Sequence, residues 1–305
     1  MASVALFLHH RHAEAVALAR DATAWLLERG HEVRLLPGDA EHAGLDERAC
    51  SAEHLTAGLD VAVSLGGDGT MLRAVDLVAG DDVPVIGVNL GHLGYLAEVE
   101  PQHLCDTLSR FFAGDYHVQE RMRLTVEVST ASGPTAERRA YPALNEAVLS
   151  KTPTGQIVRV DVGVDGERFT TYAADGIIVA TPTGSTAYAW SAGGPIVAPD
   201  HAALLITPVA PHMLFDRSLV LPPTASIRLE VAADRAAALS VDGRSLGLLQ
   251  VGDVVTCTAA SSPARVVTFE PRGFLAILKA KFGLNDAGAT GRRERDDRLD
   301  VRGDA

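Results

Sequence analysis

The chain has 305 residues, 47% of them hydrophobic and 5% aromatic, so it can fill a sizeable aliphatic core and is not disordered throughout. Its 27 basic and 39 acidic residues give a formal net charge of −12 at pH 7. This charge argues against a main function in binding nucleic acid or an anionic membrane. The cysteines (Cys50, Cys105 and Cys257) are too few and too widely spaced for a disulfide framework or a thiolate zinc site.

Strands and helices alternate over the first 120 residues. The first apolar run is followed by His9-His10-Arg11-His12 and has no basic segment before it, so we interpret it as a core strand rather than a signal peptide. The alternation predicts a parallel sheet with right-handed crossovers. Apolar runs predict strands at 4–8, 32–36, 60–65 and 83–88, and helical spacing predicts helices at 13–28 (ended by Gly30), 71–78 and 103–112.

From about Arg123 the apolar period changes from 3.6 to 2. The alternation within 124–128, 158–164 and 227–231 predicts antiparallel strands, and Asp165-Gly166 and Asp242-Gly243 predict two-residue hairpin turns. We therefore expect an α/β N-terminal domain with a parallel sheet over 1–120 and a mainly antiparallel, β-rich C-terminal domain over 121–270. The charged segment 286–305 is predicted to be a disordered tail.

The most informative segment is a glycine-rich loop, Gly66-Gly67-Asp68-Gly69-Thr70, between a buried strand and an amphipathic helix. Its glycines let the backbone approach a ligand, and the helix N-terminus after it suits a phosphate. Asp68 would repel a phosphate unless it holds a metal ion or removes a proton from an attacking hydroxyl. A tight strand-to-helix turn is the alternative reading. The loop lacks the lysine of a P-loop and the G-x-G-x-x-G of a dinucleotide dehydrogenase.

Three further segments could bind a nucleotide. Residues 89–96 follow a strand at the sheet edge where α/β folds bind ligands, although two glycines there also suit a plain turn. Asn145-Glu146 could hydrogen-bond sugar hydroxyls or an adenine edge, or could end an exposed strand. Residues 175–195 run from Asp175 through a strand into a Thr/Ser/Gly turn, where hydroxyls and amides could bind phosphate or ribose and Tyr188 or Trp190 could stack on a base. A hydroxyl-capped helix is the alternative there.

In this order, these segments resemble the NAD kinase family over nearly all of residues 60–215. The most specific pieces are G-G-D-G-T at 66–70, L-N-E at 144–146 and D-G-I-I-V-A-T-P-T-G-S-T-A-Y at 175–188. The resemblance implies an α/β N-terminal and a β-rich C-terminal domain, with the chain's end (271–285) returning to the first. It also implies that Asp68 is the catalytic base. Some family members have a basic residue two positions before Asp175, where this chain has Ala173.

The resemblance also implies which residues contact nucleotides. Arg73 would lie near phosphates, one turn into the helix after the glycine loop. The turn at Arg244 falls where some members place another contact, although a hairpin also explains it. The implied nucleotide-binding residues are Asp68, Gly69, Arg73, Asn145, Glu146, Asp175, Thr186, Ala187, Tyr188, Ala189, Trp190, Ser191, Ala210 and Arg244.

The implied activity is transfer of a terminal phosphoryl group from ATP or inorganic polyphosphate to the 2′-hydroxyl of the adenosine ribose of NAD. A divalent metal ion, Mg²⁺, would neutralise charge on the donor, and no residue is assigned as a dedicated metal ligand. We expect a cytoplasmic homo-oligomer, a dimer or tetramer, with no nucleic-acid or membrane partner. Two alternatives stay open: a lipid or sphingoid kinase with the same glycine loop, and a non-catalytic sensor that binds a dinucleotide.

Overall fold

The computed structural model describes residues 1–91, 94–130, 138–152, 156–232, 235–269 and 273–284. It divides into two compact units, residues 1–270 and 271–305. The described part of the second unit is the helix α7 (Phe274–Phe282), which ends at Gly283 in a left-handed conformation with φ 60°. The tail predicted at 286–305 lies outside the described residues. None of the helices in the described ranges has the length and apolar character needed to cross a membrane.

The N-terminal domain is an α/β layer structure around a six-stranded sheet of order β2-β1-β3-β4-β18-β5. Neighbouring strands are parallel except for β18 and β5, which are antiparallel. Its elements are β1 (Ser3–Leu8), α1 (Ala13–Glu28), β2 (Glu32–Leu35), α2 (Pro37–Ala43), α3 (Ala52–Thr56), β3 (Val61–Gly66), α4 (Asp68–Val78), β4 (Val85–Asn89), α5 (Leu104–Phe112), β5 (His117–Arg121) and β18 (Ala264–Thr268). The parallel sheet and its helices confirm the predicted fold class.

Helices cover both faces of this sheet, because successive strand residues point to opposite sides. Leu6 and Val63 pack with α1 and α5 on one face. Phe7 and Ala62 pack with α3 and α4 on the other. The buried strands therefore appear as continuous apolar runs in the sequence, as expected for parallel strands covered on both faces.

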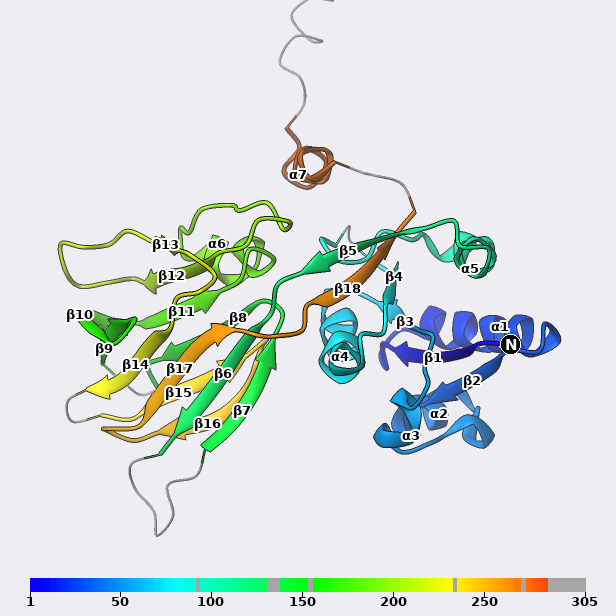
Figure 1. Cartoon of the computed structure of the whole chain (residues 1–305), viewed down its shortest axis with the longest axis horizontal. Coiled ribbons are helices and arrows are strands. Elements are labelled where there is room, and N and C mark those ends of the chain that lie inside the picture. The colour runs from blue at the N-terminus through cyan, green and yellow to red at the C-terminus, as the bar shows by residue number, and fades with distance from the viewer. Residues whose placement is uncertain (92–93, 131–137, 153–155, 233–234, 270–272, 285–305) are drawn as a thin grey trace, which may run out of the picture. The chain divides into compact units, whose positions relative to one another are not determined.

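The C-terminal domain is a sandwich of two antiparallel sheets (Figure 1). The second sheet has the order β10-β9-β14-β17-β6-β7, and the third has the order β13-β12-β11-β8-β15-β16. The elements are β6 (Leu124–Ser129), β7 (Arg138–Ala143), β8 (Glu146–Ser150), β9 (Val158–Val164), β10 (Glu167–Ala174), β11 (Gly176–Ala180), α6 (Tyr188–Ser191), β12 (Leu204–Val209), β13 (Leu219–Leu221), β14 (Ile227–Ala232), β15 (Ala237–Val241), β16 (Arg244–Leu249) and β17 (Val254–Ala259).

Both predicted hairpin turns are confirmed. Asp165 and Gly166 join β9 to β10, and Asp242 and Gly243 join β15 to β16. All four residues have positive φ (53°, 82°, 46° and 75°), as a type I′ turn requires. The apolar side chains that alternate along these strands form one core between the two sheets.

One strand lies in a different sheet from the one predicted. Residues 264–268 fall within the range predicted for the β-rich domain, but β18 pairs with β4 and β5 in the first sheet. Figure 1 shows β18 running beside β5. An apolar strand pattern specifies a buried strand but does not specify the strands with which it pairs, so sequence reasoning had no signal for this return.

Candidate functional site

The carboxyl ends of β1 and β3 form the part of the parallel sheet most suited to a ligand. After β1 the chain continues to β2 on one side, and it then crosses to β3 on the other side of β1. A crevice at such a reversal of strand order is where open α/β sheets bind ligands. The glycine loop follows β3 at this point, and His9, which directly follows β1, donates its N–H to Leu65 O at 3.0 Å.

Asp68 is the first residue of α4, and Gly67 is the N-cap. The helix therefore begins at Asp68 instead of Met71, the start predicted from apolar spacing. The half-buried carboxylate accepts hydrogen bonds from the N–H groups of Tyr95 and Leu96, both at 3.3 Å. Gly94 is close to Asp68 Oδ1 and has no room for a side chain. The predicted segment 89–96 thus holds the Asp68 carboxylate in place, while His92 and Leu93 lie outside the described residues.

A buried arginine near Asp68 was missed by the sequence analysis. Arg121, at the end of β5, is 6% exposed, and its guanidinium donates to Gln119 Oε1 at 2.8 and 3.1 Å. Burial lowers the pKa of Arg121 to about 10, while Asp200, Glu98 and Asp68 act in the opposite direction. Arg121 therefore stays positively charged at neutral pH and attracts the Asp68 carboxylate. A single arginine in a strand gives no local sign of such a role.

Arg73 lies at the same end of the sheet, with its guanidinium bound to a buried carboxylate. Its Nη2 is 2.8 Å from Asp39 Oδ1 and 3.1 Å from Oδ2, and it also donates to Leu8 O at 2.8 Å. The Asp39 side chain is fully buried, whereas the Arg73 side chain is 38% exposed. Asp39, on α2, was also missed by the sequence analysis, because its partner is distant in the sequence.

The Asn145-Glu146 pair is held by the hairpin turn at Asp242. The Asp242 carboxylate accepts from the backbone N–H groups of Leu144, Asn145 and Glu146 at 2.7, 2.8 and 3.0 Å. Asp242 N donates in return to Glu146 O at 3.0 Å. Leu144 is buried in the same core cluster as Met71 of α4, so this segment lies beside the helix that begins at Asp68. The structure thus brings Asn145 and Glu146 toward the glycine loop.

Glu146 is 7% exposed, and its environment favours a neutral carboxyl group. Burial and the charge of Asp242 raise the pKa of Glu146 to about 8, and a hydrogen bond from the Tyr188 backbone opposes them. Burial also raises the pKa of Asp242, against the three backbone N–H groups that favour its charged form. Glu146 Oε2 is buried without a hydrogen-bond partner among the described residues. A ligand that supplies a polar group here would satisfy it.

The Thr/Ser/Gly turn packs directly on this pair. Thr181 donates its hydroxyl to Leu144 O at 2.6 Å and its N–H to Asn145 O at 2.9 Å. A Cβ added to Gly184 would collide with the Asn145 backbone, so the turn requires glycine there. The predicted residues Thr186 to Ser191 follow in a 3₁₀ turn and α6, with Tyr188 and Trp190 exposed by 43% and 42%.

Asp175 and Ala210 lie together at the opposite end of the third sheet. In this antiparallel register Gly176 is opposite Ser150 and Val209, whereas Ala180 is opposite Glu146. A strand of five residues at ~3.4 Å each spans roughly 17 Å. Asp175 forms an ion pair with Lys151 at 2.7 Å, and Ala210 has a φ of 42°. The structure therefore does not bring these two residues together with Asn145 and Glu146.

Arg244 links the two domains through an ion pair. Its Nη1 is 3.3 Å from Asp76 Oδ2 on α4, and the two side chains are 54% and 39% exposed. Gly69, beside Asp68, is exposed, with open space where a Cβ would lie. No cluster of three or more His, Cys, Asp or Glu side chains that could hold a metal ion occurs in the described part of the chain.

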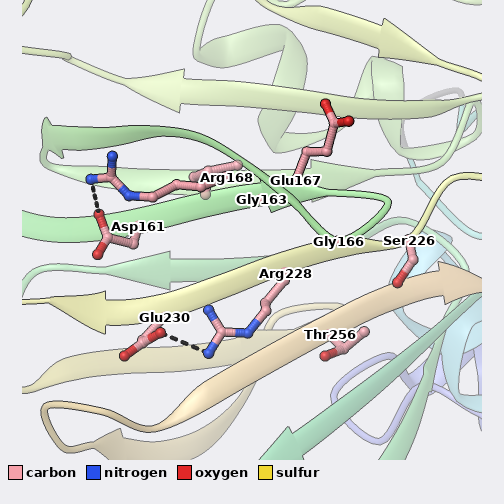
Figure 2. A pocket seen from close by; sticks show the side chains of 10 residues that line it. Asp161, Gly163, Gly166, Glu167, Arg168, Ser226, Arg228, Glu230 and Thr256 are labelled. Carbon is pink, nitrogen blue, oxygen red and sulfur yellow. Dashed lines mark hydrogen bonds and ion pairs between the residues drawn. The ribbon is translucent and has the colours of Figure 1, made fainter.

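A separate hollow of about 410 Å³ lies on the second sheet, among β9, β10, β14 and β17 (Figure 2). Arg168 pairs there with Asp161 at 3.1 Å, and Arg228 pairs with Glu230 at 2.7 Å. None of the predicted site residues lines this hollow, and its arginines are already paired with carboxylates. We therefore assign the candidate site to the carboxyl edge of the parallel sheet.

Comparison with known proteins gives one family. Residues 4–116 match the model described as the ATP-NAD kinase N-terminal domain, and residues 144–269 match the ATP-NAD kinase C-terminal domain. The chain is 37% identical over 287 residues to the NAD kinase of Syntrophotalea carbinolica, covering 94% of this chain and 100% of that relative. It is 38% identical over 307 residues to the NAD kinase of Nocardia farcinica, covering 95% and 94%.

Two solved structures are similar over most of their length. The yeast NADH kinase complexed with NADH has a TM-score of 0.86 and 26% identity, covering 94% of this chain and 89% of that one. The NAD kinase from Archaeoglobus fulgidus in complex with ATP has a TM-score of 0.69 and 26% identity, covering 92% and 99%.

Proposed function

The chain belongs to the NAD kinase family, and we propose that it transfers the terminal phosphoryl group of ATP to the 2′-hydroxyl of the adenosine ribose of NAD, with Asp68 as the catalytic base. The observation that carries the proposal is the placement of the Asp68 carboxylate. It starts a helix at the sheet edge where a phosphate would bind, and two backbone N–H groups hold it there.

In this mechanism Asp68 accepts the proton of the ribose 2′-hydroxyl as its oxygen attacks the terminal phosphorus of ATP. The bond from that phosphorus to the bridging oxygen breaks, and ADP leaves. Phosphoryl transfer depends mainly on positioning and charge stabilisation. The N-terminus of α4 with its positive dipole end and the Arg73 guanidinium would supply both for the donor.

Asn145 and Glu146 would bind NAD, together with Tyr188 and its neighbours from Thr186 to Ser191. At neutral pH a protonated Glu146 could donate a hydrogen bond from its otherwise unpartnered carboxyl oxygen. Asp175 and Ala210 would contact a different part of the dinucleotide from Asn145, because a whole strand separates the two groups. Arg244 would contact the nucleotide only by leaving Asp76.

We also propose that Mg²⁺ is required and that it arrives with the phosphates of ATP. Magnesium is commonly bound through one or two carboxylates plus substrate phosphates rather than in an all-protein cage. Because Asp68 is kept as the base, the phosphates of ATP would supply the protein-bound Mg²⁺ with its ligands, and bound Mg²⁺ would neutralise charge on the donor. We further propose that the protein is a homo-oligomer in the cytoplasm. This part of the proposal rests on the family resemblance.

The test is product formation by purified protein with NAD, ATP and Mg²⁺, measured with an NADP-specific dehydrogenase. NADP is the expected product, and chelation of Mg²⁺ should abolish it. Parallel reactions replace ATP with polyphosphate, or NAD with diacylglycerol or sphingosine in mixed micelles. Phosphorylation of the lipids but not of NAD would contradict the proposal, as would NAD binding without turnover with either donor.

A further inference from the structure

We infer that Asp39 is a positioning residue for the phosphoryl donor, because it holds the Arg73 guanidinium at the β1/β3 edge where the terminal phosphates of ATP bind. This inference rests on the proposed NAD kinase function and adds to it a residue outside the sequence motifs. Asp39 lies on α2, 34 positions before Arg73, and contacts it only through the fold.

The Asp39 carboxylate is fully buried and has several hydrogen-bond donors around it. It accepts from Arg73 Nη2 at 2.8 Å, from His10 Nε2 at 2.7 Å and from Leu8 N at 3.4 Å. Because an ionised carboxylate only accepts, His10 Nε2 carries the proton of its bond. Because it is buried, the Asp39 carboxylate cannot contact a ligand itself. Its partners Arg73 and His10 are partly exposed and lie between Asp39 and the solvent.

Among the described residues, Nε and Nη1 of the Arg73 guanidinium make no short hydrogen bond and remain available to a ligand. Nη2 is used by Asp39 and Leu8 O, while Nη1 has only a long contact of 3.5 Å with His10 Nε2. Within the described part of the chain, Arg73 Nε donates no hydrogen bond. The N–H groups of Nε and Nη1 point in different directions, so each can donate one charge-assisted hydrogen bond to a phosphate oxygen.

The hydrogen-bonded side chains of Asp39, Arg73 and His10 lie where the donor ATP, rather than NAD, would bind. His9, which precedes His10 in the loop after β1, packs against the glycine loop: a Cβ added to Gly66 would lie 3.0 Å from His9 Cβ. Arg73 lies one turn beyond the start of α4, whose N-terminus faces the same edge. The Asn145 segment belongs to the other domain, and its backbone N–H groups are bound by Asp242 rather than by the Asp39 network.

A buried ion pair is not explained by stability alone. Desolvation of the two charges commonly offsets their attraction, and apolar replacements are often as stable. Arg73 is also only partly buried, so solvent or a ligand can reach the side chain that Asp39 orients. A carboxylate that fixes one side of an arginine lowers the entropy cost of phosphate binding on the other side.

The test is a double-mutant cycle of Asp39→Asn, Arg73→Gln and the double variant, with KM for ATP, KM for NAD, kcat and the thermal midpoint measured for each. We expect Asp39→Asn to raise KM for ATP about tenfold, corresponding to the loss of one charge-assisted contact, and to leave KM for NAD within about twofold. Adding Asp39→Asn to Arg73→Gln should raise KM for ATP no further, since both act through one guanidinium.

Asp161→Asn is the matched control, because Asp161 also pairs with an arginine but lies on the second sheet away from the site. Three results would overturn the inference. These are a parallel rise in both KM values, a fall in kcat or in the thermal midpoint alone, and independent effects of the two changes in the double variant. If Asp39→Asn does not fold, KM for ATP is measured for Arg73→Lys instead. A lysine can pair with Asp39 or bind the phosphate but cannot do both, so we expect this KM to rise. An unchanged KM for ATP would then overturn it. Wild-type NADP formation tests the proposed function separately.

Discussion

Glu146 and Asp242 are two buried carboxyl groups beside the proposed NAD site, and they differ in what surrounds them. Asp242 accepts from three backbone N–H groups, which favour its charged form. Among the described residues, Glu146 accepts from the backbone of Tyr188, and its Oε2 has no hydrogen-bond partner. The proton of this pair therefore belongs on Glu146, where it can be used in a hydrogen bond to NAD.

The raised pKa of Glu146 predicts a pH-dependent stability. In the unfolded chain this carboxyl loses its proton near the ordinary glutamate pKa of 4.5, whereas in the folded chain it keeps the proton up to about pH 8. Between these values the unfolded state binds fewer protons, so the free energy of unfolding falls as pH rises, by at most about 1.4 kcal/mol per pH unit.

Glu146→Gln should remove this component, because glutamine resembles the neutral acid and does not titrate. Urea unfolding of both proteins from pH 5 to pH 8 measures it. The wild type should lose stability relative to the variant across this range. Parallel profiles would mean that Glu146 is charged in the folded protein.

Individual site residues could be predicted from the sequence where they belong to a short motif of unusual composition. Asp68 stands out as a charge among three glycines, and Asn145-Glu146 stands out between apolar residues. Asp39 and Arg121 have no such signal. Each acts through partners that only the folded chain brings near, such as Asp39 with Arg73, so no local pattern distinguishes them from surface charges.

At the scale of elements, the β15–β16 hairpin does more than reverse the chain. Its Asp242 binds the start of β8, so Asp242→Ala would leave three partly buried backbone N–H groups without that acceptor. We expect the free energy of unfolding to fall by about 2–4 kcal/mol, and KM for NAD to rise as Asn145 and Glu146 loosen.

Asp165→Ala is a matched control for this change. Asp165 occupies the same position of a type I′ turn, with φ 53°, but within the described residues its carboxylate accepts one backbone bond, from Ser226 at 2.8 Å. Alanine at positive φ costs a similar amount in both turns, so the difference between the variants isolates the three bonds. Equal losses of stability, with KM for NAD unchanged in both, would count against the role assigned to Asp242.

Element types were largely predictable from periodicity, but strand partners were not. The change from period 3.6 to period 2 near Arg123 correctly separated a helix-rich region from a strand-rich one. The return of β18 to the first sheet was missed, because pairing depends on packing between distant segments. The start of α4 was placed too late because apolar spacing does not register a polar first turn such as Asp68-Gly69-Thr70.

For the whole molecule, the arrangement of sheets determines which candidate residues can act together. The α/β domain contributes the glycine loop and Arg73, and the β-rich domain contributes Asn145 and Glu146 through a segment that packs on α4. Asp175 and Ala210 lie at the far end of the third sheet. Linear order gave no measure of this separation, because Asp175 is joined to the rest of its motif by a single strand.

We propose that this fold places Asp68 to take the proton of the ribose 2′-hydroxyl, and the turnover of Asp68→Asn tests this role. Asparagine keeps the size of the side chain and one of the two oxygens that accept from Tyr95 and Leu96. The bond that is lost is a long one of 3.3 Å, so the fold and NAD binding should persist. We predict that kcat for NADP formation falls by about 10²–10⁴-fold, with NAD affinity by calorimetry within a few-fold of wild type. Near-normal kcat in folded Asp68→Asn protein would mean that Asp68 is not the base.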